Sequence, residues 1–80
     1  IKNIENDVKK IVSEEFNISL DNVNLETSPR NVDLWDSLGQ LNLVSQLEQY
    51  FSIVFEFEEL FQIVSVKSII EIIKSKLNEK

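Results

Sequence analysis

The feature that most constrains the fold of this chain is the helical spacing of its apolar residues. In three stretches of the 80 residues, apolar side chains recur three or four positions apart, which places them on one face of an α-helix. The expected helices cover residues 3–16, 37–51 and 66–77. Their apolar stripes are Ile4, Val8, Ile11, Val12 and Phe16; Leu38, Leu41, Val44, Leu47 and Phe51; and Val66, Ile69, Ile70, Ile73 and Leu77.

The ends of these helices carry capping residues. Asn3 can accept a hydrogen bond at the start of the first helix, and Asn17 suits the position just after its end. Ser65 is expected to cap the last helix. Three lysines complement the partial negative charge at the C-terminal end of that helix: Lys74, Lys76 and Lys80.

Residues 17–36 form a connection that is long for a compact domain. Its many apolar residues predict that it packs on the core. Residues 18–25 fit either a short hairpin around Asp21 and Asn22 or a single helical turn capped by Ser19. The sequence leaves both interpretations open, and it predicts a turn over residues 27–30.

Residues 52–64 carry a mixed pattern. Ile53, Phe55 and Phe57 alternate with other residues as in a β-strand, but no good partner strand is available. An irregular segment that leads into a short helix over residues 58–61 is therefore expected. Four phenylalanines of this region are expected in the core: Phe51, Phe55, Phe57 and Phe61.

These elements predict one all-α domain over residues 1–80. It is a small four-helix bundle of three longer helices and one short third helix, with a long loop between helices 1 and 2. One glycine and one proline leave little scope for tight hairpins. Leu47 and Ile70 should face each other across the bundle, or nearly so. Leu43, which falls off its stripe, should contribute less to stability.

Composition excludes several functions. The chain has no cysteine, histidine or methionine, so disulfides, thiol catalysis, cysteine metal sites and a serine–histidine–aspartate triad are absent. We therefore expect neither an autonomous enzyme nor a metal centre. A formal charge of −6 and a pI near 4.5 argue against binding to nucleic acid.

The longest apolar run, Ile53-Val54-Phe55, is far too short to span a membrane. The first residues contain no apolar stretch of the signal-peptide type, so a cytoplasmic location is expected. We expect the chain to be a monomer that meets basic partners.

The sequence Asp36-Ser37-Leu38 stands at the head of the second helix. A helix N-terminus carries unpaired N–H groups and a partial positive charge, so it suits a phosphate. We therefore predict that Ser37 attaches a phosphate-linked prosthetic arm. The local alternative is a capping box, in which Ser37 caps the helix and Gln40 reaches back. Asp36 could be the cap, could hold a modifying enzyme, or could do both.

The sequence resembles the acyl carrier proteins over nearly its whole length. The attachment motif of that family resembles Asp36-Ser37-Leu38, which here lies between a long loop and an amphipathic helix. The other matching segments are Val8-Lys9-Lys10-Ile11, Leu43-Val44, Leu47-Glu48, Phe51, Phe57-Glu58-Glu59-Leu60 and residues 66–73.

The resemblance implies a four-helix bundle in which Ser37 receives 4′-phosphopantetheine from coenzyme A. A separate magnesium-dependent phosphopantetheinyl transferase would add it, with Asp36 and Leu38 beside the attachment point. The thiol of the arm would then carry acyl groups as thioesters between acyl-loading and acyl-using enzymes. The rival interpretation is an unmodified acidic helical module that binds another protein.

The sequence departs from the fatty-acid-synthesis members of that family at two places. Leu34-Trp35 stand where those members usually show Gly-Ala, and Glu48 is the sole acid of a helix otherwise rich in amides and hydroxyls. The form Trp-Asp-Ser-Leu resembles stand-alone carriers of specialised pathways, and fatty-acid or polyketide-type synthesis is the alternative. We predict that partners recognise this carrier mainly by shape, through Leu38 and the set Gln40, Leu41, Asn42, Ser45 and Glu48.

Two further features have structural interpretations. Trp35 is expected as an anchor in or at the rim of the core, because an indole buries a large area with one polar group. Glu56, Glu58 and Glu59 are most simply a solvated face; a weak cation site or a landing point for a basic partner are the alternatives.

Overall fold

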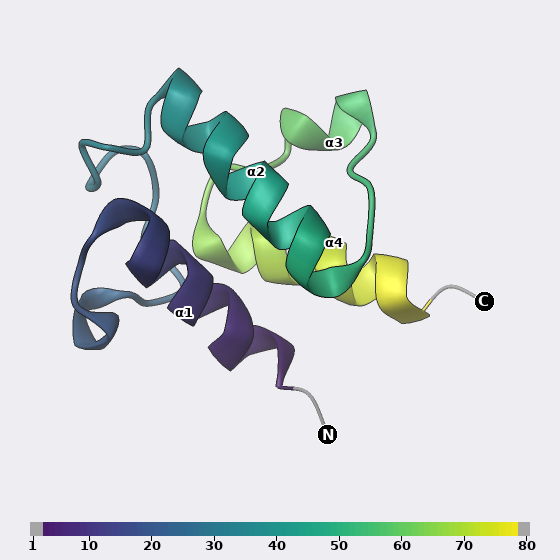
Figure 1. Cartoon of the computed structure of the whole chain (residues 1–80), viewed down its shortest axis with the longest axis horizontal. Helices are drawn as coiled ribbons and strands as arrows, with labels where there is room; N and C mark the ends of the chain where they lie inside the picture. The colour runs from purple at the N-terminus through teal and green to yellow at the C-terminus, as the bar shows by residue number, and fades with distance from the viewer. Residues whose placement is uncertain (1–2, 79–80) are drawn as a thin grey trace.

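A computed structural model describes residues 3–78, and Lys80 lies outside that range. The elements follow the order α1 (Ile4–Phe16), a 3₁₀ turn (Leu20–Asn22), α2 (Ser37–Phe51), α3 (Phe57–Leu60) and α4 (Val66–Asn78) (Figure 1). Within residues 3–78 there is no β-strand. The expected all-α fold with one short third helix is confirmed.

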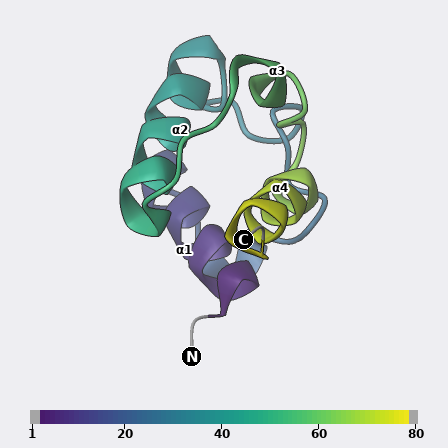
Figure 2. The ribbon, with the colours of Figure 1, turned by 90° about the vertical axis from the view of Figure 1, so that its right-hand side faces the viewer.

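Helix α1 packs against both α2 and α4. Figure 2 shows α2 on the left and α4 on the lower right of the molecule. Helix α1 lies toward the bottom of this view, and α3 lies at the upper right. The Cα radius of gyration is 11.6 Å, which is the value expected for a compact domain of this length. The helices therefore enclose one common core.

The helix ends follow local capping chemistry. Asn3 Oδ1 accepts the N–H of Asn6 at 3.0 Å, which confirms the expected cap of α1. Asn17 adopts a left-handed backbone (φ 55°), and its N–H donates to the carbonyl of Ser13. Ser65 Oγ accepts the N–H of Ser68 at 3.2 Å at the start of α4. All three capping predictions are confirmed.

The stripes of α1 and α4 face the core as expected, with Ile4, Ile11 and Leu77 half-buried at its edge and the other members buried. The stripe predicted for α2 is partly wrong. Leu38 and Leu41 are 68% and 60% exposed, whereas Leu43 is fully buried. The buried face of α2 consists of Gly39, Leu43, Val44, Leu47 and Phe51. This face begins at a glycine, which adds nothing to an apolar pattern, so the spacing of the leucines indicated the wrong edge of the helix.

The core also corrects the prediction for the phenylalanines. Phe51 and Phe55 are buried, but Phe57 and Phe61 are 70% and 71% exposed and pack edge-to-face at 5.2 Å. Helix α3 has only four residues, so it cannot define an apolar face of its own. Leu60, rather than either phenylalanine, is the α3 residue that packs against the core.

The long connection between α1 and α2 contains the helical turn, not the hairpin. Ser19 Oγ accepts the N–H of Asp21 at 3.3 Å and caps Leu20–Asn22. Residues 28–31 form a turn, close to the expected position. The carbonyls of Thr27 and Leu25 accept the N–H groups of Val66 and Lys67 at 2.9 and 3.0 Å. The loop thereby satisfies donors that every helix N-terminus leaves unpaired, and it ties itself to α4.

Candidate functional site

Ser37 is the first residue of α2, and it is exposed. The residue that caps this helix is Asp36, whose Oδ1 accepts the N–H of Gly39 at 2.9 Å. The carbonyl of Asp36 accepts the N–H of Gln40 at 2.7 Å. The acid therefore does the capping, and the serine beside it is not needed for that purpose.

The alternative interpretation, a capping box between Ser37 and Gln40, is wrong. Gln40 Oε1 accepts the indole N–H of Trp35 at 2.7 Å, and Gln40 Nε2 donates to the carbonyl of Leu60 at 3.4 Å. Among residues 3–78, no group forms a hydrogen bond with the Ser37 hydroxyl. The structure therefore leaves that oxygen exposed at the head of a helix, without a structural task.

Gly39 sets the geometry of this helix end. A Cβ at this position would lie 2.1 Å from the carbonyl oxygen of Leu34 and 3.0 Å from Phe16 Cε1. A glycine is therefore required for the loop to approach the first turn of α2 so closely. The apolar spacing of the sequence does not mark this residue. The available signal was that the single glycine of the chain follows directly after the serine motif.

Exposed apolar side chains stand near Ser37 in the sequence. Leu34, Leu38 and Leu41 are all exposed around the N-terminal half of α2. A shallow groove beside them is lined by Glu15, Phe16, Leu34, Asp36, Leu38, Gly39 and Asn42. The arrangement combines an exposed hydroxyl, a helix N-terminus that favours a phosphate, and an apolar surface that a partner could cover.

Two comparisons with known proteins agree with this geometry. The family described as "Phosphopantetheine attachment site" matches residues 6–73. The chain is 36% identical over 80 residues to the acyl carrier protein of Coprothermobacter proteolyticus, covering all of this chain and 89% of that protein. The chain belongs to the acyl carrier protein family.

Acyl carrier proteins hold a covalently attached 4′-phosphopantetheine prosthetic group, and this chain is a carrier of that type. Such carriers interact with a phosphopantetheinyl transferase and with the enzymes of their pathway. The residues present suit the group, because α2 has a free hydroxyl at its first position. The N–H groups of that first turn supply the partial positive charge that a phosphodiester favours.

The residues expected to meet partners divide into two sets. Leu41, Asn42 and Ser45 are exposed on α2. Gln40 and Glu48 instead have partners inside the molecule. Glu48 Oε2 accepts the N–H of Phe55 at 2.9 Å and so holds the segment that follows α2. Trp35 is 2% exposed and stacks on Phe16 at 5.3 Å, as expected for an anchor.

The acidic residues before and within α3 are partly used in the fold. Glu59 pairs with Lys76 of α4 at 2.8 Å, and its Oε1 also accepts the N–H of Glu56 at 2.7 Å. The hydrogen bond from Lys76 lowers the pKa of Glu59 below its ordinary value. Glu56 and Glu58 are exposed. Within residues 3–78 no group of three acidic, histidine or cysteine side chains is placed to hold a metal ion.

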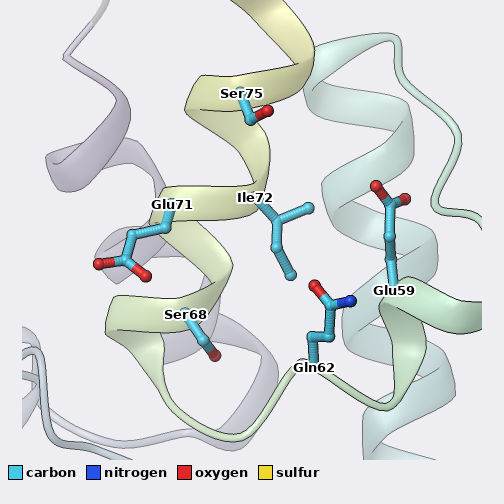
Figure 3. Close-up of a pocket in the computed structure, with 6 residues that line it drawn as sticks. All are labelled: Glu59, Gln62, Ser68, Glu71, Ile72 and Ser75. Atoms are coloured by element: carbon cyan, nitrogen blue, oxygen red, sulfur yellow. The ribbon is translucent and has the colours of Figure 1, made fainter.

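A second groove lies between α3 and α4, and Figure 3 shows the side chains around it. Its lining is mostly polar and consists of Glu59, Gln62, Ser68, Glu71, Ile72 and Ser75. None of these residues belongs to the surroundings of Ser37.

Among the described residues, 3–78, none of the helices has the length and apolar character that a membrane-spanning helix needs.

Proposed function

We propose that Ser37 is the residue that carries 4′-phosphopantetheine, and that the arm carries acyl intermediates as thioesters. The observation that supports this most strongly is that Asp36, and not Ser37, caps α2. Asp36 caps the helix, so the neighbouring hydroxyl stays exposed and unbonded among the described residues. A serine kept only for folding would be expected to cap the helix itself.

The proposed attachment is a phosphoryl-type transfer to Ser37. Its Oγ forms a bond with the phosphorus that bears the pantetheine of coenzyme A. The phosphoanhydride bond of coenzyme A breaks, and adenosine 3′,5′-bisphosphate leaves. The hydroxyl proton passes to a base on the separate magnesium-dependent transferase. This chain has neither histidine nor cysteine, so we assign it no catalytic step of its own.

Intact mass spectrometry tests the attachment. The protein is incubated with coenzyme A, Mg²⁺ and a broad-specificity phosphopantetheinyl transferase, and the wild type should gain one phosphopantetheine. Ser37→Ala should gain none, whereas Ser45→Ala, which removes another exposed hydroxyl from the same helix, should gain one. A wild type that stays unmodified while a known carrier is modified would support the rival function, an unmodified interaction module.

We further propose that the pathway is a specialised one rather than housekeeping fatty-acid synthesis. The exposed surface after Ser37 offers leucines, an amide and a hydroxyl at Leu38, Leu41, Asn42 and Ser45, and the one acid of α2 is bonded to the next segment. Partners that hold such a surface by shape should bind with little dependence on salt. Titrations of the loaded carrier against candidate enzymes at low and high salt test this, and steep salt dependence with the native partner would contradict it.

A further inference from the structure

One side chain joins the attachment loop to α3. Gln40 lies one helical turn after Ser37 and is half-buried. Its carbonyl oxygen accepts the indole N–H of Trp35 at 2.7 Å, and its amide nitrogen donates to the carbonyl of Leu60 at 3.4 Å. The two partners lie five residues before and twenty residues after Gln40 in the sequence. A single amide therefore bridges the loop before Ser37 and the last residue of α3.

The Trp35 end of the bridge holds the loop that leads into the attachment site. Trp35 is almost fully buried, and its ring stacks on Phe16 of α1. Its one polar group is the indole N–H, and a buried donor without a partner is costly. Since Trp35 directly precedes Asp36 and Ser37, the acceptor on Gln40 helps to set where the serine is presented.

The Leu60 end of the bridge holds α3. None of the residues of α3 is fully buried, and its phenylalanine Phe57 faces solvent together with Phe61. The remaining contacts of α3 with other helices include the ion pair between Glu59 and Lys76. Leu60 is the α3 residue that packs against the core, and it is only half-buried. Each polar contact therefore has a large share in fixing the position of this helix.

We propose that Gln40 is a positioning residue of this carrier. Through one end it fixes the loop that presents Ser37, and through the other it fixes α3, so partner enzymes meet both surfaces in one arrangement. This inference rests on the proposed attachment at Ser37. It replaces the expectation that Gln40 contacts partners directly.

Three variants separate the two ends of the bridge. Gln40→Glu keeps an acceptor for Trp35 but removes the donor to Leu60. Trp35→Phe removes the indole N–H but leaves the amide free to bond Leu60. Gln46→Glu is the matched control, because this exposed glutamine makes the same change of charge on the same helix. Its side chain forms no hydrogen bond with residues 3–78.

The first measurement is amide hydrogen exchange of the unmodified protein. In Gln40→Glu, the amides of residues 60–63 should exchange about threefold to tenfold faster than in Gln46→Glu, the factor expected for one lost hydrogen bond. Amides of α1 and α4 should keep their wild-type rates. Equal exchange in the two variants, or equal acceleration throughout the molecule, would overturn the proposal.

The second measurement is the kinetics of phosphopantetheine transfer from coenzyme A. Trp35→Phe should raise the KM of the transferase for the carrier about threefold to tenfold with little change in kcat, because the loop is less well positioned. Gln40→Glu should keep the wild-type KM, and an equal rise in both variants would overturn the separation of the two ends. If the wild type is not modified, the proposed attachment site is refuted instead. The hydrogen-exchange measurement uses the unmodified protein, so it tests the role of Gln40 in either case.

Discussion

Helices α1 and α4 are held by a different kind of interaction from the region around Ser37 and α3. The first pair buries apolar side chains completely, as at Val8, Val12, Val66, Ile69 and Ile73. Around the start of α2 and in α3, apolar burial is limited to a few residues such as Trp35 and Leu60, and directional bonds made by polar side chains are added to it. Burial of apolar area contributes a large free energy that changes little when side chains shift slightly. A hydrogen bond contributes a smaller free energy and requires a narrow range of distance and angle. We therefore expect the first region to determine stability and the second to determine how the carrier is presented.

Truncation of the buried face of α2 should have the largest effect. Leu43→Ala and Leu47→Ala should each lower the free energy of unfolding by about 2–5 kcal/mol, because each leaves a cavity in a fully buried site. Leu41→Ala, on the exposed side of the same helix, should change it by less than about 0.5 kcal/mol. Urea unfolding of the three variants measures this, and equal losses at Leu41 and Leu43 would mean that the buried face is wrong.

Gly39→Ala should have the next largest effect. The added methyl would collide with the carbonyl of Leu34, so the loop must move, and such overpacking costs about 1–3 kcal/mol. Asn42→Ala is a suitable control, because Asn42 is exposed less than one turn further along α2. Urea unfolding compares the two variants. A loss at Gly39 no larger than that at Asn42 would show that the loop relaxes freely.

The cap of α2 separates two neighbouring residues by function. Asp36→Ala should cost about 1 kcal/mol of stability, because the N–H of Gly39 loses its acceptor. Ser37→Ala should cost less than about 0.5 kcal/mol, since its hydroxyl is unbonded within the described residues. Thermal or urea unfolding of both variants decides the matter. A larger loss for Ser37→Ala would make the serine a structural residue and weaken the proposed function.

The smallest expected effect is a pH dependence confined to α3. The pKa of Glu59 lies below its ordinary value of 4.5, mainly because Lys76 donates a hydrogen bond to it. The folded state therefore binds this proton less readily than the unfolded state. The resulting stability is present above pH 4.5 and is lost as the pH falls through the lowered pKa. Its size should be under about 1 kcal/mol, as for other partly exposed ion pairs.

Nuclear magnetic resonance can follow this transition residue by residue. On acidification, the signals of the residues around Glu59 should shift at a pH below 4.5, the ordinary pKa of a glutamate. Lys76→Met should move this transition to higher pH, because the pKa of Glu59 returns toward its ordinary value. An unchanged midpoint in Lys76→Met would show that the ion pair does not lower this pKa.

Most of the secondary structure was predictable from the sequence, because it depends on contacts a few residues apart. Asn3 and Asn17 act within one turn of their own helix, and their roles follow from side-chain size and backbone preference. The stripes of α1 and α4 were predicted correctly because their apolar residues are also their buried ones. Ser37 was recognised as the candidate attachment site from its place before an amphipathic helix.

The sequence by itself thus determined where the helices lie, how several of them are capped and which serine stands at the head of α2. Only the tertiary structure decided that Leu43 is buried while Leu38 is exposed, and that Gln40 bonds Trp35 and Leu60. These outcomes depend on the close approach of the loop at Gly39 and on the placement of α3 beside α2 and α4. Contacts between segments distant in the chain choose among faces that are equally apolar locally, so no short-range pattern could have distinguished them.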